Sequence, residues 1–362
     1  MRPSALIPAL ALALIANTAP AQQSAPAENH STTESEAPQR DTSFIDSAGR
    51  AHITRVIPVP ESLSFQSRYW LAEPVKDGGP EMSLAERRKG TDDWAATARD
   101  AWFKLYPGTL TEDKIAGVPV RIVVPANLDP ARKDDILLNV HGGGFNSDSG
   151  SYTESIPMAG MTGVKVVAVL YRLAPENPFP ASVDDTVAVY KELLKSHKPS
   201  QIILYGTSAG AILTGEVAVR LKQLNLPQPA ALGIFSGMGD FARNGDSQSM
   251  YALRGLSGHL DLPEDGPHDP QYVAKTDPKD PVLSPIYADL HGLPPTLFIT
   301  SGRDLLLSGT VNLHRAFLNA GNDARLIVYD GLPHAFWYST KLPEALEANH
   351  AMASFFLQQL PK

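Results

Sequence analysis

Residues 201–224, QIILYGTSAGAILTGEVAVRLKQL, contain the segment that decides the fold. QIILY is apolar and predicts a buried strand, and AILTGEVAVRLKQL predicts the helix that follows it. Between them lies a G-x-S-x-G pattern at residues 206–210. A strand, a sharp turn and a helix are the setting in which this pattern presents its serine as a nucleophile. We therefore predict that Ser208 is a nucleophile. The alternative is a glycine-rich connection in which the serine only caps the helix.

The chain around this segment alternates short apolar runs with helical patterns. Continuous apolar strands suit a parallel sheet that is covered on both faces, and the alternation indicates a doubly wound α/β architecture. The helix candidates are residues 183–194, 209–224, 308–320 and 343–359, with a further helical pattern over 83–106. The predicted strands are residues 109–116, 118–124, 136–141, 164–171, 202–206, 231–236, 296–301 and 325–329.

A serine nucleophile needs a base, and the base is usually oriented by an acid. His334 follows the predicted strand ARLIVYD, and Asp304 follows the predicted strand TLFIT. Both therefore lie after the carboxyl ends of strands, where open α/β sheets place their sites. The sequence predicts His334 as the base and Asp304 as the acid. Asp330 and Asp323 are the alternative acids.

Residues 141–145 read HGGGF and directly follow the strand ILLNV. Consecutive glycines can turn their backbone N–H groups toward one point, and such donors stabilise the oxyanion of a tetrahedral intermediate. A flexible surface loop is the alternative. The position at the end of a strand, upstream of the G-x-S-x-G pattern, favours the oxyanion loop.

Five ordered motifs resemble the hormone-sensitive lipase family of α/β-hydrolases: HGGGF, YRLAPENPFPAS, GTSAGA, SGRDLLLS and GLPHAF. The resemblance runs from about residue 108 to the carboxyl terminus. It implies a mostly parallel eight-stranded sheet with helices on both faces and a helical cap. It also implies that Gly143, Gly144 and Ala209 supply the oxyanion N–H groups, and that His141 helps to hold the loop. Many members carry Asp where this chain has Thr207, and the GTSAG subgroup contains esterases of short acyl esters and some lactone hydrolases.

The composition and charge of the chain exclude several classes of function. The 362 residues carry a net charge of −8, which argues against a nucleic-acid binder. The chain has no cysteine, which excludes disulfides, thiolate nucleophiles and cysteine-bound metals. No HExxH pattern is present. We therefore expect no cofactor and no metal, and a small-molecule ester as the binding partner.

The amino-terminal residues predict export. Arg2, an apolar run over residues 5–16 and Ala19-Pro20-Ala21 have the layout of a signal peptide, cut after residue 21. The run is shorter than the ~20 residues that span a bilayer, so we expect no stable membrane anchor and a periplasmic or secreted protein. Residues 22–43 predict a disordered linker. We assign 44–105 to an amino-terminal cap segment and 106–362 to the catalytic domain, with a second cap insert at about 238–290.

The sequence thus predicts a serine carboxylesterase that hydrolyses short to medium acyl esters. A lactone hydrolase, or a non-catalytic ligand-binding protein of the same fold, is the alternative. The cap segment is rich in large apolar side chains, which either pack in its core or face a substrate channel. These are Phe65, Tyr69, Trp70, Leu71, Trp94, Trp102 and Phe103.

Overall fold

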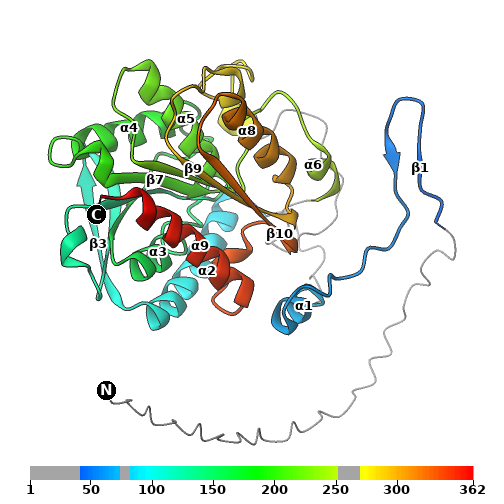
Figure 1. The fold of residues 1–362 in the computed structure, drawn as a ribbon, viewed down its shortest axis with the longest axis horizontal. Coiled ribbons are helices and arrows are strands. Elements are labelled where there is room, and N and C mark those ends of the chain that lie inside the picture. Colours follow the sequence, from blue (N-terminus) through cyan, green and yellow to red (C-terminus); the bar gives the residue numbers. More distant parts are fainter. Residues whose placement is uncertain (1–40, 74–81, 252–269, 362) are drawn as a thin grey trace, which may run out of the picture. The chain divides into compact units, whose positions relative to one another are not determined.

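The computed structural model describes residues 41–73, 82–251 and 270–361 (Figure 1). The signal peptide expected at 1–21, most of the expected linker and parts of both cap segments lie outside the described residues. The chain divides into two compact units, residues 1–58 and 59–362. In the described part of the first unit, β1 (Phe44–Ile45) and β2 (Ala51–His52) pair antiparallel.

The second unit is built on an eight-stranded sheet with the order β10-β9-β8-β7-β5-β6-β4-β3. The pairs from β10 to β6 are parallel, and β4 pairs antiparallel with both β3 and β6. All eight predicted strands are present, so the predicted fold class is confirmed. The strands are β3 (Gly108–Ile115), β4 (Val118–Pro125), β5 (Ile136–Val140), β6 (Lys165–Val169), β7 (Ile202–Thr207), β8 (Ala231–Phe235), β9 (Thr296–Arg303) and β10 (Ala324–Pro333).

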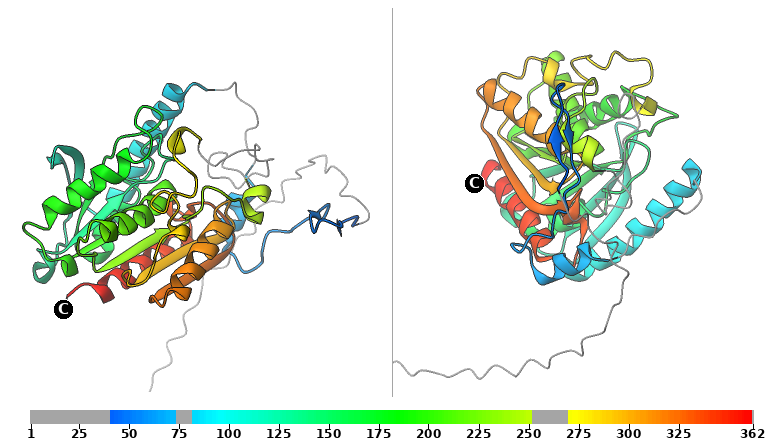
Figure 2. Two further views of the ribbon diagram at one scale, coloured as in Figure 1. Left: turned by 90° about the horizontal axis from the view of Figure 1, so that it is seen from above. Right: turned by 90° about the vertical axis from the view of Figure 1, so that its right-hand side faces the viewer.

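Helices cover both faces of this sheet, and the turned views in Figure 2 show the sheet between its two helical layers. On one face, side chains of α4 (Ala181–Leu193), α5 (Ala209–Gln223) and α8 (Leu307–Asn319) pack against the sheet. On the other face, α3 (Ser155–Thr162) and α9 (Pro343–Gln359) do so. The strands alternate between the two cores: Leu138 faces the first and Leu137 the second. The described residues form four further helices: α1 (Phe65–Leu71), α2 (Leu84–Leu105), α6 (Asp246–Met250) and α7 (Pro270–Val273). Trp102 of α2 packs in the second core and Tyr272 of α7 in the first.

The local sequence predicts helix α2 but not helix α3. Ser83 and Glu86 form a capping box at the start of α2, which is the signal expected at a helix amino terminus. Helix α3 was not expected from the sequence, because it is short and mostly buried and therefore has no polar face to give it a helical period. Within the described residues, no helix is both long and apolar enough to cross a membrane.

Candidate active site

The site lies where the carboxyl ends of neighbouring parallel strands meet. Strands β5, β7, β8, β9 and β10 are consecutive in the sheet and run parallel, so the residues after them share one edge. The glycine loop follows β5, Ser208 follows β7, and Ser236 follows β8. Asp304 follows β9 and His334 follows β10. The sheet topology therefore gathers residues that are far apart in the sequence.

Ser208 occupies a strained turn between β7 and α5. Its φ of 59° and ψ of −123° are unusual for a residue with a side chain, and its N–H donates to the carbonyl of Phe235 at 2.9 Å. A Cβ at Gly206 or at Gly210 would collide with the carbonyl oxygen of Val140 in β5. The two glycines of the pattern are thus required because the turn packs directly against the neighbouring strand.

His334 and Asp304 form a buried pair. His334 Nδ1 lies 2.8 Å from Asp304 Oδ1, and Asp304 is fully buried. Burial alone would raise the pKa of the Asp304 carboxyl. The pKa is nevertheless lowered, because the charge and hydrogen bond of His334 and the hydroxyl of Ser236 stabilise the carboxylate. Thr300 Oγ1 donates to the same carboxylate at 3.0 Å, and so does the N–H of Leu306 at 2.8 Å.

The second ring nitrogen of His334 is available for chemistry. In the neutral imidazole, a proton on Nδ1 can bond the carboxylate that this nitrogen faces, and the lone pair is then on Nε2. His334 Nε2 is buried and has no hydrogen-bond partner among the residues that the structure describes. An imidazole held in this tautomer can accept a proton at Nε2.

The two alternative acids lie elsewhere. Asp330 is exposed and accepts a hydrogen bond from Ser62 Oγ at 3.2 Å. Asp323 pairs with Arg325 at 3.5 Å. Of the three candidate acids, Asp304 is the one that the fold joins to His334.

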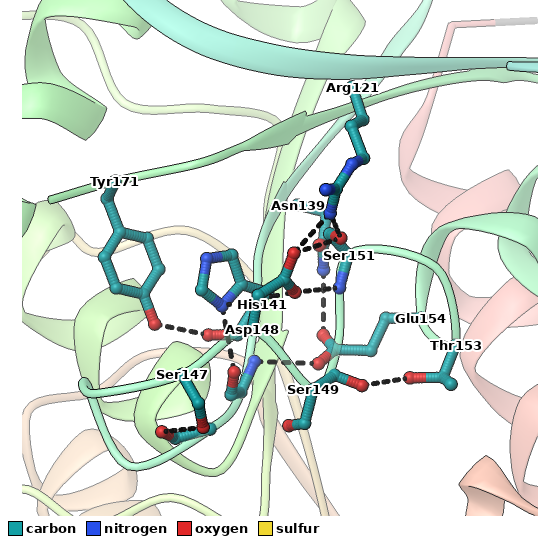
Figure 3. Close-up of polar contacts among 12 residues, drawn as sticks. Arg121, Asn139, His141, Ser147, Asp148, Ser149, Ser151, Thr153, Glu154 and Tyr171 are labelled. Carbon is teal, nitrogen blue, oxygen red and sulfur yellow. Dashed lines mark hydrogen bonds and ion pairs between the residues drawn. The ribbon is translucent and has the colours of Figure 1, made fainter. Parts of the chain in front are cut away.

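The HGGGF loop directly follows β5, and Figure 3 shows its first residue, His141, beside Tyr171. Gly143 and Gly144 have φ of 120° and 58°, a region that favours glycine, and a Cβ at Gly143 would collide with the backbone of Ser147. The His141 ring stacks on Tyr171 with 4.2 Å between centroids, and the Tyr171 hydroxyl donates to the His141 carbonyl at 2.6 Å. The side chain of His141 therefore supports the loop from behind.

Sequence reasoning missed three residues that shape this site. Ser236 bonds Asp304, Glu154 accepts the N–H of Gly142 at 3.0 Å, and Trp337 donates to Thr207 at 3.1 Å. None lies in a recognisable pattern, and each contact joins residues from different elements. No local signal in the chain could have revealed them.

An apolar groove of about 690 Å³ lies between α1, α2 and residues 335–342, the segment that directly follows His334. Phe65, Tyr69, Trp70 and Trp94 line it, and the ring of Trp94 lies 6.0 Å from that of Tyr338. The aromatic residues of the cap segment thus divide into two groups, because Trp102 is instead fully buried against the sheet core.

Arg88 fixes α2 next to the glycine loop. Its guanidinium donates to the carbonyls of Asn146 at 2.6 Å and Ala174 at 2.9 Å, and it pairs with Glu176 at 2.8 Å. The helix that forms one wall of the groove is therefore attached to the segment that follows the glycines.

Within the described parts of the chain, no group of three or more histidine, aspartate or glutamate residues is arranged to hold a metal ion. The chemistry that the site offers comes from the serine, the imidazole, the carboxylate and the backbone N–H groups.

Residues 137–338 match the family described as the alpha/beta hydrolase fold. The chain belongs to the α/β-hydrolase family. The chain is 34% identical to an acetyl-hydrolase of Streptomyces hygroscopicus over 231 residues, which cover 62% of this chain and 77% of that protein. It is 29% identical to an esterase of Acinetobacter venetianus over 230 residues, which cover 62% of this chain and 75% of that protein.

Solved structures of α/β-hydrolases resemble the fold closely. The esterase E25 matches with a TM-score of 0.73 and 30% identity, over 85% of this chain and 98% of that one. An esterase from the bacterial hormone-sensitive lipase family matches with a TM-score of 0.68 and 28% identity, over 82% and 96%. The resemblance to the hormone-sensitive lipase family is thus confirmed, and the chain is a carboxylic ester hydrolase.

Proposed function

We propose that the protein is a serine carboxylesterase in which Ser208, His334 and Asp304 form the triad. Ser208 Oγ attacks the ester carbonyl while His334 Nε2 takes its proton. His334 then returns the proton to the leaving alcohol, and Asp304 stabilises the imidazolium. Water hydrolyses the acyl-enzyme by the same route. The observation that carries the proposal is the buried His334–Asp304 pair at the same sheet edge as Ser208, with a His334 Nε2 that has no hydrogen-bond partner in the described part of the chain.

In this mechanism, the N–H groups of Gly143, Gly144 and Ala209 form the oxyanion hole. The two glycines turn at the end of β5, and Ala209 is the first residue of α5. Because β5 and β7 are neighbours, both donor groups start from adjacent strands. The helix amino terminus adds a favourable field for the negative charge that develops on the oxygen.

We propose that the substrates are short to medium acyl esters whose apolar part lies in the groove. A volume of about 690 Å³ is within the range of small-molecule sites, and several aromatic side chains contribute to the lining. The names of the relatives, acetyl-hydrolase and esterase, agree with small ester substrates.

We further propose that the protein is exported after cleavage behind Ala21. The support is the signal-peptide layout of residues 1–21. Mass spectrometry of the exported protein should find Gln22 at its amino terminus. An active enzyme that keeps Met1 and stays with the membrane would contradict this.

The triad is tested with a fluorophosphonate label and a p-nitrophenyl ester. The wild type should be labelled and Ser208→Ala should not, with a loss of about 10⁶-fold in turnover. Ser196→Ala, an exposed serine beyond α4, is the control and should behave as the wild type. Substantial activity in a folded Ser208→Ala variant would show that another residue is the nucleophile.

A further inference from the structure

Glu154 lies buried beneath the proposed site and is not part of its triad. It immediately precedes α3 and is 4% exposed. Its two carboxylate oxygens accept four hydrogen bonds, and each oxygen takes two of them. Figure 3 shows the bond from Asn139. Oε1 accepts from the N–H of Gly142 at 3.0 Å and from the hydroxyl of Tyr338 at 2.6 Å. Oε2 accepts from Asn139 Nδ2 at 2.8 Å and from the N–H of Thr207 at 3.1 Å.

The donors come from three separate segments of the proposed machinery. Gly142 directly precedes the two glycines of the oxyanion loop, and Thr207 directly precedes Ser208. Tyr338 lies four residues after His334 (338 − 334) and belongs to the turn that begins at Phe336. One carboxylate thus joins the oxyanion loop, the nucleophile strand and the segment after the base.

We propose that Glu154 is a positioning residue for the hydrolysis: its carboxylate fixes the oxyanion loop relative to Ser208. This inference rests on the function proposed above. Displacing a catalytic group by about 1 Å can lower a rate by 10²-fold, so a bond that sets the distance between the loop and the nucleophile affects turnover directly. Glu154 does not itself line the groove, although its donor Tyr338 does, so we expect substrate binding to depend on Glu154 less than turnover does.

A glutamine cannot replace the carboxylate at this position. Its amide oxygen can accept the bonds of one pair of donors, and its NH₂ group then faces the other pair. Each pair contains one backbone N–H, from Gly142 or from Thr207, and a backbone N–H cannot rotate to become an acceptor. In either orientation, one of these two buried N–H groups is therefore repelled and left unsatisfied.

The charged and titratable groups around Glu154 are few. Tyr338 and Tyr205 face it from the segment after His334 and from β7, and the Tyr205 hydroxyl donates to the Glu154 carbonyl at 3.1 Å. Asp148 is a second nearby carboxylate, and it is paired with Arg121 and lies 3.6 Å from His141 Nδ1. The negative charge of Asp148 also raises the pKa of the Glu154 carboxyl.

The test compares Glu154→Gln with Asp135→Asn at pH 8. Asp135 is a buried carboxyl at the amino end of β5, at the opposite edge of the sheet, where it pairs with Arg132 at 3.3 Å. For Glu154→Gln we expect kcat on p-nitrophenyl butyrate to fall about 10- to 100-fold with KM little changed. The inhibition constant of a trifluoromethyl ketone, which forms a tetrahedral adduct, should rise in proportion. Asp135→Asn should keep wild-type kcat.

Both variants must show a cooperative thermal transition above the assay temperature. A folded Glu154→Gln enzyme with wild-type kcat and wild-type affinity for the ketone would overturn the inference while the proposed function stands. If wild-type protein neither hydrolyses the ester nor takes the fluorophosphonate label, the proposed function fails and the inference fails with it.

Tyr338→Phe decides the question if Glu154→Gln does not fold. This change removes one of the four donors and keeps the ring that lines the groove. A loss of about 3-fold or more in kcat at unchanged KM supports the inference, because loosening one bond moves the loop less than repelling a backbone N–H. An unchanged kcat overturns it.

Discussion

The indole N–H of Trp337 donates to the hydroxyl of Thr207 at 3.1 Å, and both side chains are buried. The bond joins the residue before Ser208 to the turn after His334. Thr207 is also where this chain departs from the many hormone-sensitive lipase family members that carry Asp. The N–H of Thr207 already bonds the Glu154 carboxylate, so an aspartate here would bring a second buried carboxylate close to the first. The neutral hydroxyl avoids that repulsion and still accepts from Trp337.

A double-mutant cycle should detect the bond between Thr207 and Trp337. Thr207→Val keeps the shape but leaves the indole N–H unpaired, which costs about 1–3 kcal/mol of the free energy of unfolding. Trp337→Phe removes the donor. Urea denaturation measures the free energy of unfolding of both single variants and of the double variant. The loss in the double variant should be about 1 kcal/mol smaller than the sum of the two single losses. Strictly additive losses would mean that the two side chains are not coupled.

The acid can be identified by two isosteric substitutions. Asp304→Asn should lower turnover by about 10⁴-fold, because an amide at this position allows the wrong tautomer of His334. Asp330→Asn is the matched control and should have a small effect, since Asp330 is exposed and bonded to Ser62. Steady-state kinetics on one ester would check both. If the two effects were reversed, Asp330 would be the acid.

Acyl-chain preference should depend on the groove. Each methylene that leaves water contributes about 0.8 kcal/mol, so removing the Trp94 ring should lower kcat/KM for longer acyl chains more than for acetate. A series of p-nitrophenyl esters from acetate upward measures this for Trp94→Ala. Leu318→Ala, an exposed apolar residue on α8, is the control. Deletion of residues 22–43 should also leave the preference unchanged, because we predict that this segment is disordered.

A uniform loss across all chain lengths in Trp94→Ala would contradict the groove as a specificity site. Specificity would then have to come from residues 238–290.

Glu154 should make stability depend on pH. Burial raises the pKa of Glu154 to about 7 from an ordinary value of 4.5, although the hydrogen bonds from Tyr338, Gly142 and Asn139 oppose the rise. Between these two values the folded state holds a proton that the unfolded chain has released, so stability falls as pH rises through this window. This rise in pKa corresponds to a change of about 3 kcal/mol in the free energy of unfolding across the window. Over the same window, the free energy of unfolding of the wild type should therefore fall relative to that of Glu154→Gln, as denaturation at pH 4.5 and 7.5 can show. If the free energies of unfolding of the wild type and of Glu154→Gln differed by the same amount at both pH values, the carboxyl would ionise as it does in the unfolded chain.

The sequence alone determined the fold and the proposed triad. The apolar runs of β5, β6, β7 and β8 marked the centre of the sheet, because buried parallel strands are continuously apolar and short. Ser208, Asp304 and His334 could be predicted because each immediately follows a strand, and the edge at which parallel strands end is a consequence of topology. The turns at glycines 143, 144, 206 and 210 could also be predicted, because a tight turn that accepts only glycine places that residue in the sequence.

The tertiary structure decided what surrounds those residues. Glu154 and Tyr338 are 184 residues apart and lie in unrelated local patterns, yet they share a hydrogen bond at 2.6 Å. Ser236 and Asp304 meet because β8 lies beside β9, and helix α3 is so buried that no polar face marks it. The groove likewise needs α1, α2 and residues 335–342 to come together. Periodicity records only whether a residue faces a core or the solvent. Which buried polar groups meet one another is fixed by the order of the strands and the packing of the helices on them, and these contacts leave no mark on neighbouring residues in the chain.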